Sequence, residues 1–144
     1  MVLVKKIKAE ETYFLRKEIL RKNIDLPYVF EGDLDKTTFH LGVFEGDTLV
    51  CIGTFMKNNL ENLKGNHYQL RGMATSVAGR GKGFGKLLLG FATNELEKQK
   101  IDFLWCNARE VALKFYEKNN FEIIGEKFIN IAGPHFKMYK SITK

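Results

Sequence analysis

The feature that most constrains this chain is a strand-like run that passes through a glycine-rich loop into a helix, within Gln69–Lys86 (QLRGMATSVAGRGKGFGK). Glycines stand at every second position where the helix begins: Gly81, Gly83 and Gly85. The first N–H groups of a helix lack internal partners and lie at the positive end of the helix dipole, so they bind anions. Three basic residues belong to the same loop: Arg80, Lys82 and Lys86. The stretch therefore predicts a site for a phosphate or a pyrophosphate.

The totals are those of one ordinary globular domain, expected to span residues 1–144. No apolar run approaches the roughly 18 residues that a membrane span needs, and the first residues do not resemble a secretory signal. Cys51 and Cys106 lie in separate apolar runs, which predicts reduced thiols in the core. We therefore expect a cytoplasmic protein without a membrane partner.

The net charge of +6 has two interpretations, an anionic partner or a solvated basic surface. Lysines are spread along the chain, with no run longer than Lys5-Lys6. This distribution favours a phosphorylated cofactor plus solvated lysines and argues against nucleic acid as the main ligand. No cluster of His, Cys and carboxylate residues has the spacing of metal ligands, so no metal is implied.

The order of predicted elements is that of a mixed α/β sheet. Strands are predicted at 2–7, 39–43, 48–56, 68–75, 101–106, 121–125, 128–131 and 136–142, and helices at 10–22, 84–100 and 110–118. The glycine loop follows a central strand, where open α/β sheets bind ligands. The isolated Gly72 predicts a β-bulge in that strand.

Two familiar phosphate-binding loops do not fit. Lys86 is followed by Leu87, so the hydroxyl that a P-loop presents to Mg²⁺ is missing. A dinucleotide fingerprint needs an acidic residue at the end of the next strand, where this chain has Cys106-Asn107.

The pattern R-G-x-G-x-G after a strand, then a helix, a strand ending in Asn107 and a helix carrying F-Y-E-K (115–118), resembles the GNAT superfamily of acyl-CoA N-acyltransferases. Details such as W-C-N-A-R-E (105–110) are most similar to a small bacterial branch with undefined acceptors. The resemblance implies a mostly antiparallel mixed sheet flanked by helices, with a bulged central strand and a V-shaped gap for CoA. The chain departs from the family pattern at Val77, where Pro is usual, and at Asn120, where Gly is usual. Asn tolerates the left-handed conformation, so the assignment is kept.

The resemblance also implies the cofactor contacts: loop amides hold the CoA pyrophosphate, and free backbone groups of the bulged strand pair with the pantetheine arm. The residues concerned are Met73, Ala74, Thr75, Arg80, Gly81, Lys82, Gly83, Phe84, Gly85, Lys86, Asn107 and Tyr116. Asn107 has the alternative of capping the following helix. Tyr116 is expected to protonate the departing thiolate, and its alternative is a buried ring whose hydroxyl bonds elsewhere.

The general base is less well defined by the sequence. The candidates are His40, His67, His135, Glu31 and Asp33, of which histidine titrates in the useful range. His135 is expected in a loop after Gly133-Pro134, by resemblance near the acceptor. His40 alternates with apolar neighbours and is expected at the surface or in a cleft. A structural role for each residue and a water relay without a dedicated base remain alternatives.

The resemblance thus implies an N-acetyltransferase that moves an acetyl group from acetyl-CoA to a primary amine by direct attack. Arg71 is expected either to select a carboxylate or another anion of the acceptor, or to form an ion pair on the sheet face. The acceptor is a small-molecule or peptide amine of undefined identity, and a homodimer formed through sheet edges is possible. The alternative is a non-catalytic acyl-CoA-binding module or sensor on the same fold.

Overall fold

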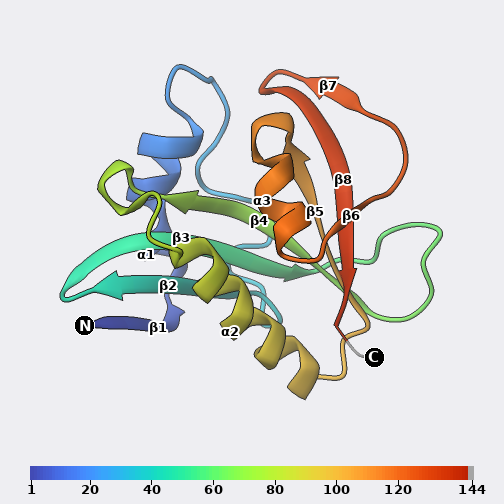
Figure 1. Cartoon of the computed structure of the whole chain (residues 1–144), viewed down its shortest axis with the longest axis horizontal. Helices are drawn as coiled ribbons and strands as arrows, with labels where there is room; N and C mark the ends of the chain where they lie inside the picture. Colours follow the sequence, from blue (N-terminus) through green and yellow to red (C-terminus); the bar gives the residue numbers. More distant parts are fainter. Residues whose placement is uncertain (143–144) are drawn as a thin grey trace.

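The computed structural model describes residues 1–142, in which eight strands form one sheet with the order β1-β2-β3-β4-β5-β8-β6, and β7 pairs with β8 (Figure 1). The strands are β1 (Val2–Ile7), β2 (Phe39–Glu45), β3 (Thr48–Lys57), β4 (His67–Thr75), β5 (Phe103–Arg109), β6 (Glu122–Ile123), β7 (Phe128–Asn130) and β8 (Gly133–Ser141). The helical segments are α1 (Ala9–Leu15), the π-helical turn η1 (Arg16–Leu20), η2 (Val77–Gly79), α2 (Phe84–Lys98), η3 (Glu110–Ala112) and α3 (Leu113–Lys118).

The sheet splits between its two central strands. All strand pairs are antiparallel except β4 with β5, which are parallel and pair only from His67 opposite Phe103 to Leu70 opposite Cys106. Beyond this point β4 continues along β3, while β5 continues along β8, and the two strands diverge (Figure 1). The predicted mixed sheet with a V-shaped opening is confirmed.

Helices cover both faces of the sheet, so β3 is buried throughout its middle. Cys51 belongs to the large core under α2, whereas the next residue, Ile52, packs with Leu15 of α1 on the opposite face. Successive side chains of a strand point to opposite faces, which explains the continuous apolar run. On α2 the side chains of Leu88 and Leu89 are buried against the sheet, whereas Leu87 is 45% exposed.

The predicted bulge lies in β4 at Gly72. Gly53 of β3 faces both Gly72 and Met73, because its neighbours pair as Ile52 with Ala74 and Thr54 with Arg71. Gly72 has φ of +61°, and a Cβ there would lie 2.7 Å from Cε2 of Phe30. The bulge therefore requires glycine for its backbone conformation and for the ring packed against it.

The end of the chain differs from the prediction. Gly133 and Pro134 were expected in a loop between the last strands, but they open β8, and His135 lies inside that strand, opposite Arg109 of β5. Because β5 ends opposite His135, Pro134 faces no β5 partner that would require its missing N–H. The left-handed conformation expected for Asn120 is confirmed, with φ of +73°.

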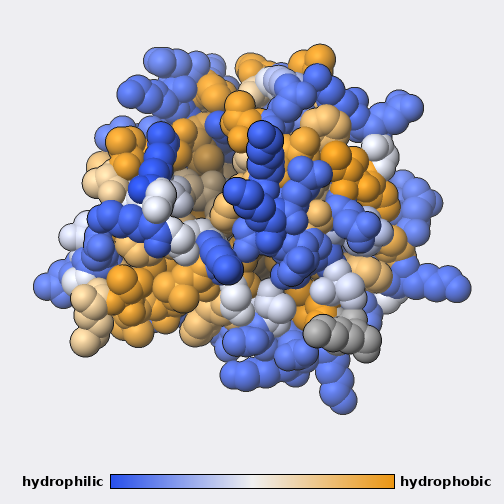
Figure 2. Space-filling view, in the orientation of Figure 1, coloured by the Kyte–Doolittle hydropathy of each residue, from blue (hydrophilic) through white to orange (hydrophobic). Residues whose placement is uncertain are grey.

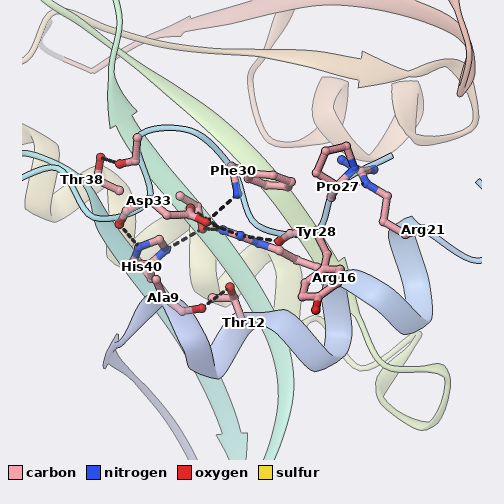
Figure 3. A network of polar contacts seen from close by, with 12 residues as sticks. Ala9, Thr12, Arg16, Arg21, Pro27, Tyr28, Phe30, Asp33, Thr38 and His40 are labelled. Atoms are coloured by element: carbon pink, nitrogen blue, oxygen red, sulfur yellow. Dashed lines mark hydrogen bonds and ion pairs between the residues drawn. The ribbon is translucent and has the colours of Figure 1, made fainter. Parts of the chain in front are cut away.

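A buried ion pair fastens the segment 23–38 to the sheet (Figure 3). Arg16 is fully buried, and its Nη1 and Nη2 donate to the two carboxylate oxygens of Asp33 at 2.7 and 2.9 Å. The same guanidinium donates to the carbonyl of Tyr28 at 2.9 Å and to the hydroxyl of Thr54 at 2.7 Å. Asp33 also accepts the N–H of Phe30 at 2.8 Å.

The pair holds Phe30 against the bulge. The Arg16 guanidinium lies 3.8 Å from the centroid of the Phe30 ring, and this ring contacts Gly72. Burial by itself raises the pKa of Asp33, but hydrogen bonds from Arg16 and from the Phe30 N–H outweigh it and hold that pKa below its ordinary value. Within residues 1–142, Nε of Arg16 is the buried side-chain nitrogen that has no hydrogen-bond partner.

We predict that Arg16→Met lowers the free energy of unfolding by roughly 3–5 kcal/mol, because it leaves the Asp33 carboxylate buried without its partner. The double variant Arg16→Met/Asp33→Leu should recover part of that loss, since no charge is then left in the site. Urea denaturation at neutral pH measures both.

The matched control is Lys127→Met, which breaks the exposed pair with Glu110, 3.1 Å long and 47% and 45% exposed. We expect it to stay within about 0.5 kcal/mol of the wild type. An Arg16→Met variant that is no less stable than this control would contradict the role given to the buried pair.

Candidate active site

A cavity of about 510 Å³ opens on the α2 side of the split. It lies between the end of β4, the loop before α2 and the helix α3, where the space-filling view shows a hollow in the surface (Figure 2). Every residue predicted to contact the cofactor lines this cavity except Lys82 and Asn107. Those that do are Met73, Ala74, Thr75, Arg80, Gly81, Gly83, Phe84, Gly85, Lys86 and Tyr116.

The glycine loop presents bare backbone to this cavity. Gly81 and Gly83 have φ of +77° and +80°, and no heavy atom lies within 4 Å of the position that a Cβ would take at either residue. The first helical bond runs from the N–H of Leu87 to the carbonyl of Gly83 at 3.1 Å, so the preceding N–H groups of the first turn are left for a ligand. Gly85 serves packing instead, because a Cβ there would lie 2.9 Å from Cζ of Phe115 in α3.

The two exceptions point elsewhere. Nζ of Lys82 lies 3.4 Å from Oε1 of Glu45 in an exposed ion pair at the end of β2. Asn107 is exposed and borders a second cavity. Their contacts with a cofactor stay predictions.

The second cavity, of about 280 Å³, lies on the other side of the split. It contains Arg71, Asn107 and His135 among the predicted residues, and it shares Met73, Ala112 and Tyr116 with the first cavity. The divergence of β4 and β5 thus creates two spaces that meet at Tyr116.

Tyr116 is buried at this junction. Its hydroxyl lies 3.8 Å from Sδ of Met73, and its ring packs edge-on against Phe115 and Phe121, each with a centroid 5.2 Å away. Burial raises the pKa of Tyr116 well above its ordinary value, and the neighbouring thiol of Cys106 adds to this effect. Its phenol is therefore protonated at neutral pH and holds a proton where the two cavities join.

His135 is the one predicted base candidate on the second cavity. Its Nδ1 lies 2.8 Å from the carbonyl oxygen of Gly133, and its ring stacks on Phe128. Since a carbonyl only accepts, this contact places a proton on Nδ1, so that in the neutral imidazole Nε2 is the acceptor. Within residues 1–142, no hydrogen bond involves that Nε2.

His40 lies in the buried network of Arg16 (Figure 3). It lines neither of the two cavities that meet at Tyr116. Its Nε2 lies 2.9 Å from the carbonyl of Asp33, and its Nδ1 lies 2.7 Å from the hydroxyl of Thr54, which accepts from Arg16. This chain of donors is satisfied by a neutral imidazole with its proton on Nε2. The position explains the apolar neighbours of His40 in the sequence and favours a structural role.

The other three base candidates also lie outside the two cavities. His67 is fully buried and bonds the loop between β3 and β4, with Nδ1 accepting from the N–H of Leu60 at 2.9 Å. Asp33 is paired with Arg16, and Glu31 is exposed on a separate groove.

The second cavity also holds two arginines that sequence reasoning missed. Arg21 comes from the end of η1 and Arg109 from the end of β5, and both line the cavity with Arg71 of β4. The only sequence signal was the position of Arg109, two residues after Asn107 on the same strand. Arg21 carried none, because segments this far apart are brought together by the tertiary fold.

Residues 1–142 contain no group of three or more His, Cys, Asp and Glu residues that could hold a metal ion. None of their helices is long and apolar enough to cross a membrane.

A split mixed sheet with a glycine-rich helix start beside the split is the fold of acyl-CoA N-acyltransferases. One such enzyme from Pseudomonas aeruginosa superposes with a TM-score of 0.79 at 18% identity, covering 97% of this chain and 99% of that one. An aminoglycoside 6'-N-acetyltransferase complexed with coenzyme A gives a TM-score of 0.76 at 13% identity, over 99% and 98% of the two chains.

Sequence comparison gives the family. The model of the acetyltransferase (GNAT) family matches residues 6–121. An uncharacterized N-acetyltransferase of Bacillus subtilis, YitI, is 35% identical over 145 residues, which cover 99% of this chain and 97% of the relative. The chain belongs to the GNAT family of acetyltransferases.

We predict that stability falls between pH 7 and pH 5 and that His40 carries part of this loss. Burial lowers the pKa of His40, and the nearby Arg16 adds to that effect against the contrary influence of Asp33. A depressed pKa means that the unfolded chain takes up the proton first, near pH 6.5. Stability is therefore complete above that pH and decreases as the pH falls toward the native pKa.

The measurement is the free energy of unfolding in urea at pH 7, 6 and 5 for the wild type and His40→Gln. The variant should lose stability less steeply with falling pH, although it is less stable at pH 7. If the free energy of unfolding of the two proteins fell equally steeply with pH, the pKa of His40 would be the same in the folded and unfolded states, which would contradict the prediction.

Proposed function

We propose that this protein is a bacterial, cytoplasmic N-acetyltransferase that moves an acetyl group from acetyl-CoA to a primary amine by direct attack. The observation that carries the proposal is the junction of the two cavities at the buried hydroxyl of Tyr116. One cavity offers a place for an anionic cofactor, and the other offers a separate place for an acceptor. The relative from Bacillus subtilis supports a bacterial origin. The two buried cysteines, which form no disulfide, support a cytoplasmic location.

The residues of the larger cavity fit coenzyme A. Gly81 and Gly83 leave open the space that a Cβ would fill, and the first-turn N–H groups of α2 would bind an anion there together with Arg80 and Lys86. These groups would hold the pyrophosphate. The backbone of β4 from Arg71 onward has no β5 partner, so its groups on that side are available for the pantetheine arm. The aminoglycoside 6'-N-acetyltransferase of similar fold is complexed with coenzyme A, which supports coenzyme A as the ligand.

When bound, acetyl-CoA supplies the acetyl group as a thioester, and its sulfur is the leaving group, as a thiolate. Backbone N–H groups within Met73–Thr75 would donate to the oxygen on which charge develops. Tyr116 would give its proton to the sulfur, as its protonated state and its position between the cavities allow. Nε2 of His135 would accept the proton of the amine, directly or through a water.

The competing function is a non-catalytic acyl-CoA-binding module or sensor. It shares the cofactor site and predicts binding without turnover. Homodimer formation through the sheet edges stays a prediction.

We predict that Gly83→Asp weakens acetyl-CoA binding at least tenfold, because φ of +80° is strained for a side chain and the new carboxylate would face the pyrophosphate. Calorimetric titration of acetyl-CoA, with ATP as a competitor for non-specific sites, measures the loss.

The matched control is Gly125→Asp, at φ of +81° with open space around its Cβ position, in the turn between β6 and β7. It adds the same charge and the same backbone strain outside the cavities. Equal weakening in both variants, or no binding of CoA to the wild type, would remove the proposed cofactor site.

Tyr116→Phe should lower kcat by roughly 100-fold or more while leaving the Kd for acetyl-CoA unchanged, because only the proton donor is lost. The assay is thiol release with amine acceptors, and Tyr139→Phe, in β8 and outside both cavities, is the control. A kcat within twofold of the wild type would assign the protonation to another group. Acetyl-CoA binding without thiol release from any amine would favour the sensor.

A further inference from the structure

Three guanidinium groups converge on the smaller cavity, from segments far apart in the chain. Arg21 follows η1, Arg71 lies beside the bulge in β4, and Arg109 ends β5. We call these three residues the arginine cluster.

Two sets of contacts hold the cluster together. Arg21 and Arg71 both lie over the ring of Phe30, with Cζ 5.5 and 4.5 Å from its centroid. Arg21 and Arg109 both donate to the carbonyl oxygen of Leu20, at 3.4 and 2.8 Å. Arg21 additionally donates from Nε to the carbonyl of Pro27 at 2.8 Å. The three cations are thus positioned by backbone carbonyls and an aromatic ring.

The protein supplies no carboxylate to neutralise the cluster. None of the residues that line this cavity is Asp or Glu, and within residues 1–142 no carboxylate lies within ion-pair distance of any of the three arginines. Asp33 is committed to Arg16. Arg71 also borders a separate groove with Glu31 and Asp35, and neither of these acids forms an ion pair with it.

The cluster is also electrostatically unfavourable as it stands. Burial lowers the pKa of Arg21, and the charges of Arg109, Arg71 and Arg16 lower it further. Burial and the charge of Arg16 likewise lower the pKa of Arg71, with only Asp33 opposing them. Partly desolvated cations without an acidic partner indicate a place where an anion binds.

We propose that the acceptor is a small primary amine that carries an anionic oxyacid group, a carboxylate or a phosphate, and that the arginine cluster binds this group. The planar fork of a guanidinium matches both anions. The proposal rests on the transferase function, because it places the amine of the same molecule toward Tyr116 and His135 in the same cavity. The volume of about 280 Å³ suits a compound of amino-acid size better than a peptide.

The phosphates of coenzyme A do not account for the cluster. None of the three arginines lines the larger cavity, where the glycine loop and its basic residues lie. The cluster and the loop are thus two separate sites for anions, one in each cavity.

The test compares matched pairs of acceptors in the thiol-release assay with acetyl-CoA. Each pair has an amino acid and its carboxamide, such as β-alanine with β-alaninamide and L-alanine with L-alaninamide, and 2-aminoethylphosphonate separates phosphate from carboxylate recognition. The quantity is the ratio of kcat/KM for the anionic compound to that for its neutral partner. Intrinsic amine basicity cancels when this ratio is compared between the wild type and a variant.

Arg71→Met should reduce the anionic-to-neutral ratio roughly tenfold or more, since hydrogen bonds between charged groups are lost. Arg21→Met should act in the same direction. The control is Lys22→Met, which removes the same charge at the residue after Arg21, outside the cavity. It should leave the anionic-to-neutral ratio unchanged. Calorimetric binding of acetyl-CoA should stay within twofold in all three variants.

A second readout does not depend on turnover. Saturation-transfer NMR with coenzyme A present measures binding of N-acetyl-β-alanine against N-acetyl-β-alaninamide to the wild type and to Arg71→Met. Preference for the anionic compound that is lost in Arg71→Met supports the proposal in either assay.

Failure of the arginine-cluster proposal can be told apart from failure of the transferase function. The arginine-cluster proposal is overturned if the wild type shows no preference for anionic acceptors, or if Arg71→Met and Arg21→Met leave the anionic-to-neutral ratio unchanged. Turnover of neutral amines would in that case still support the transferase function. Absence of acetyl-CoA binding overturns the transferase function itself. If no amine reacts although CoA binds, the NMR comparison decides the matter alone.

Discussion

Arg16 carries a full positive charge in a place that water does not reach, and the region around the site depends on how that charge is satisfied. A buried guanidinium requires a paired carboxylate and further acceptors, because its desolvation is otherwise too costly. Asp33, Thr54 and the carbonyl of Tyr28 meet this requirement, and they come from a loop and a strand that would otherwise be free to move apart. The segment 23–38, which has neither helix nor strand, is thereby closed over the sheet.

The same interaction determines the shape of the split in the sheet. With the loop closed, the ring of Phe30 lies between the Arg16 guanidinium and Gly72, where no side chain at position 72 would fit. The bulge at Gly72 lies just beyond Leu70, the last residue of β4 that pairs with β5. Because β4 bends at the bulge while β5 follows β8, the two cavities arise from a single local irregularity in β4. Tyr116 of α3 lines both cavities and lies where they meet.

Local patterns in the sequence were sufficient for the parts of the site that lie within one stretch of chain. The glycine loop, the bulge and the helix with Tyr116 each follow from short-range chemistry: glycine spacing, an isolated glycine in a strand, and a motif. Roles that depend on distant segments were not accessible in this way. His40 looked like a residue of a surface or cleft, yet it completes the Arg16 network, and His135 was expected in a loop although β8 begins before it.

One missed feature did leave a trace in the sequence. Arg16 falls on the same helical stripe as Ala9 and Thr12, which are buried, so a charge occupies a core position of the first helix. Such a conflict predicts a buried acidic partner, which a pattern search could have sought among the aspartates of 23–38. Lys82 shows the opposite case: it belongs to the glycine loop in sequence, but its side chain extends to Glu45 and not into the cavity.

The structure shows which of the chain's positive charges are paired with an acidic residue and which are not, a distinction that the net charge alone does not give. Arg16 is neutralised by Asp33, whereas Arg21, Arg71 and Arg109 repel one another around a ring and a shared carbonyl. That repulsion opposes folding, and Asp33 offsets it only in part, at Arg71. An anion that binds among these side chains would remove both the repulsion and part of the desolvation, so that its binding energy would also stabilise the closed loop. The repulsion within the arginine cluster and the selectivity for an anionic acceptor would then have one physical origin, three arginines around a cavity whose lining includes no acidic residue.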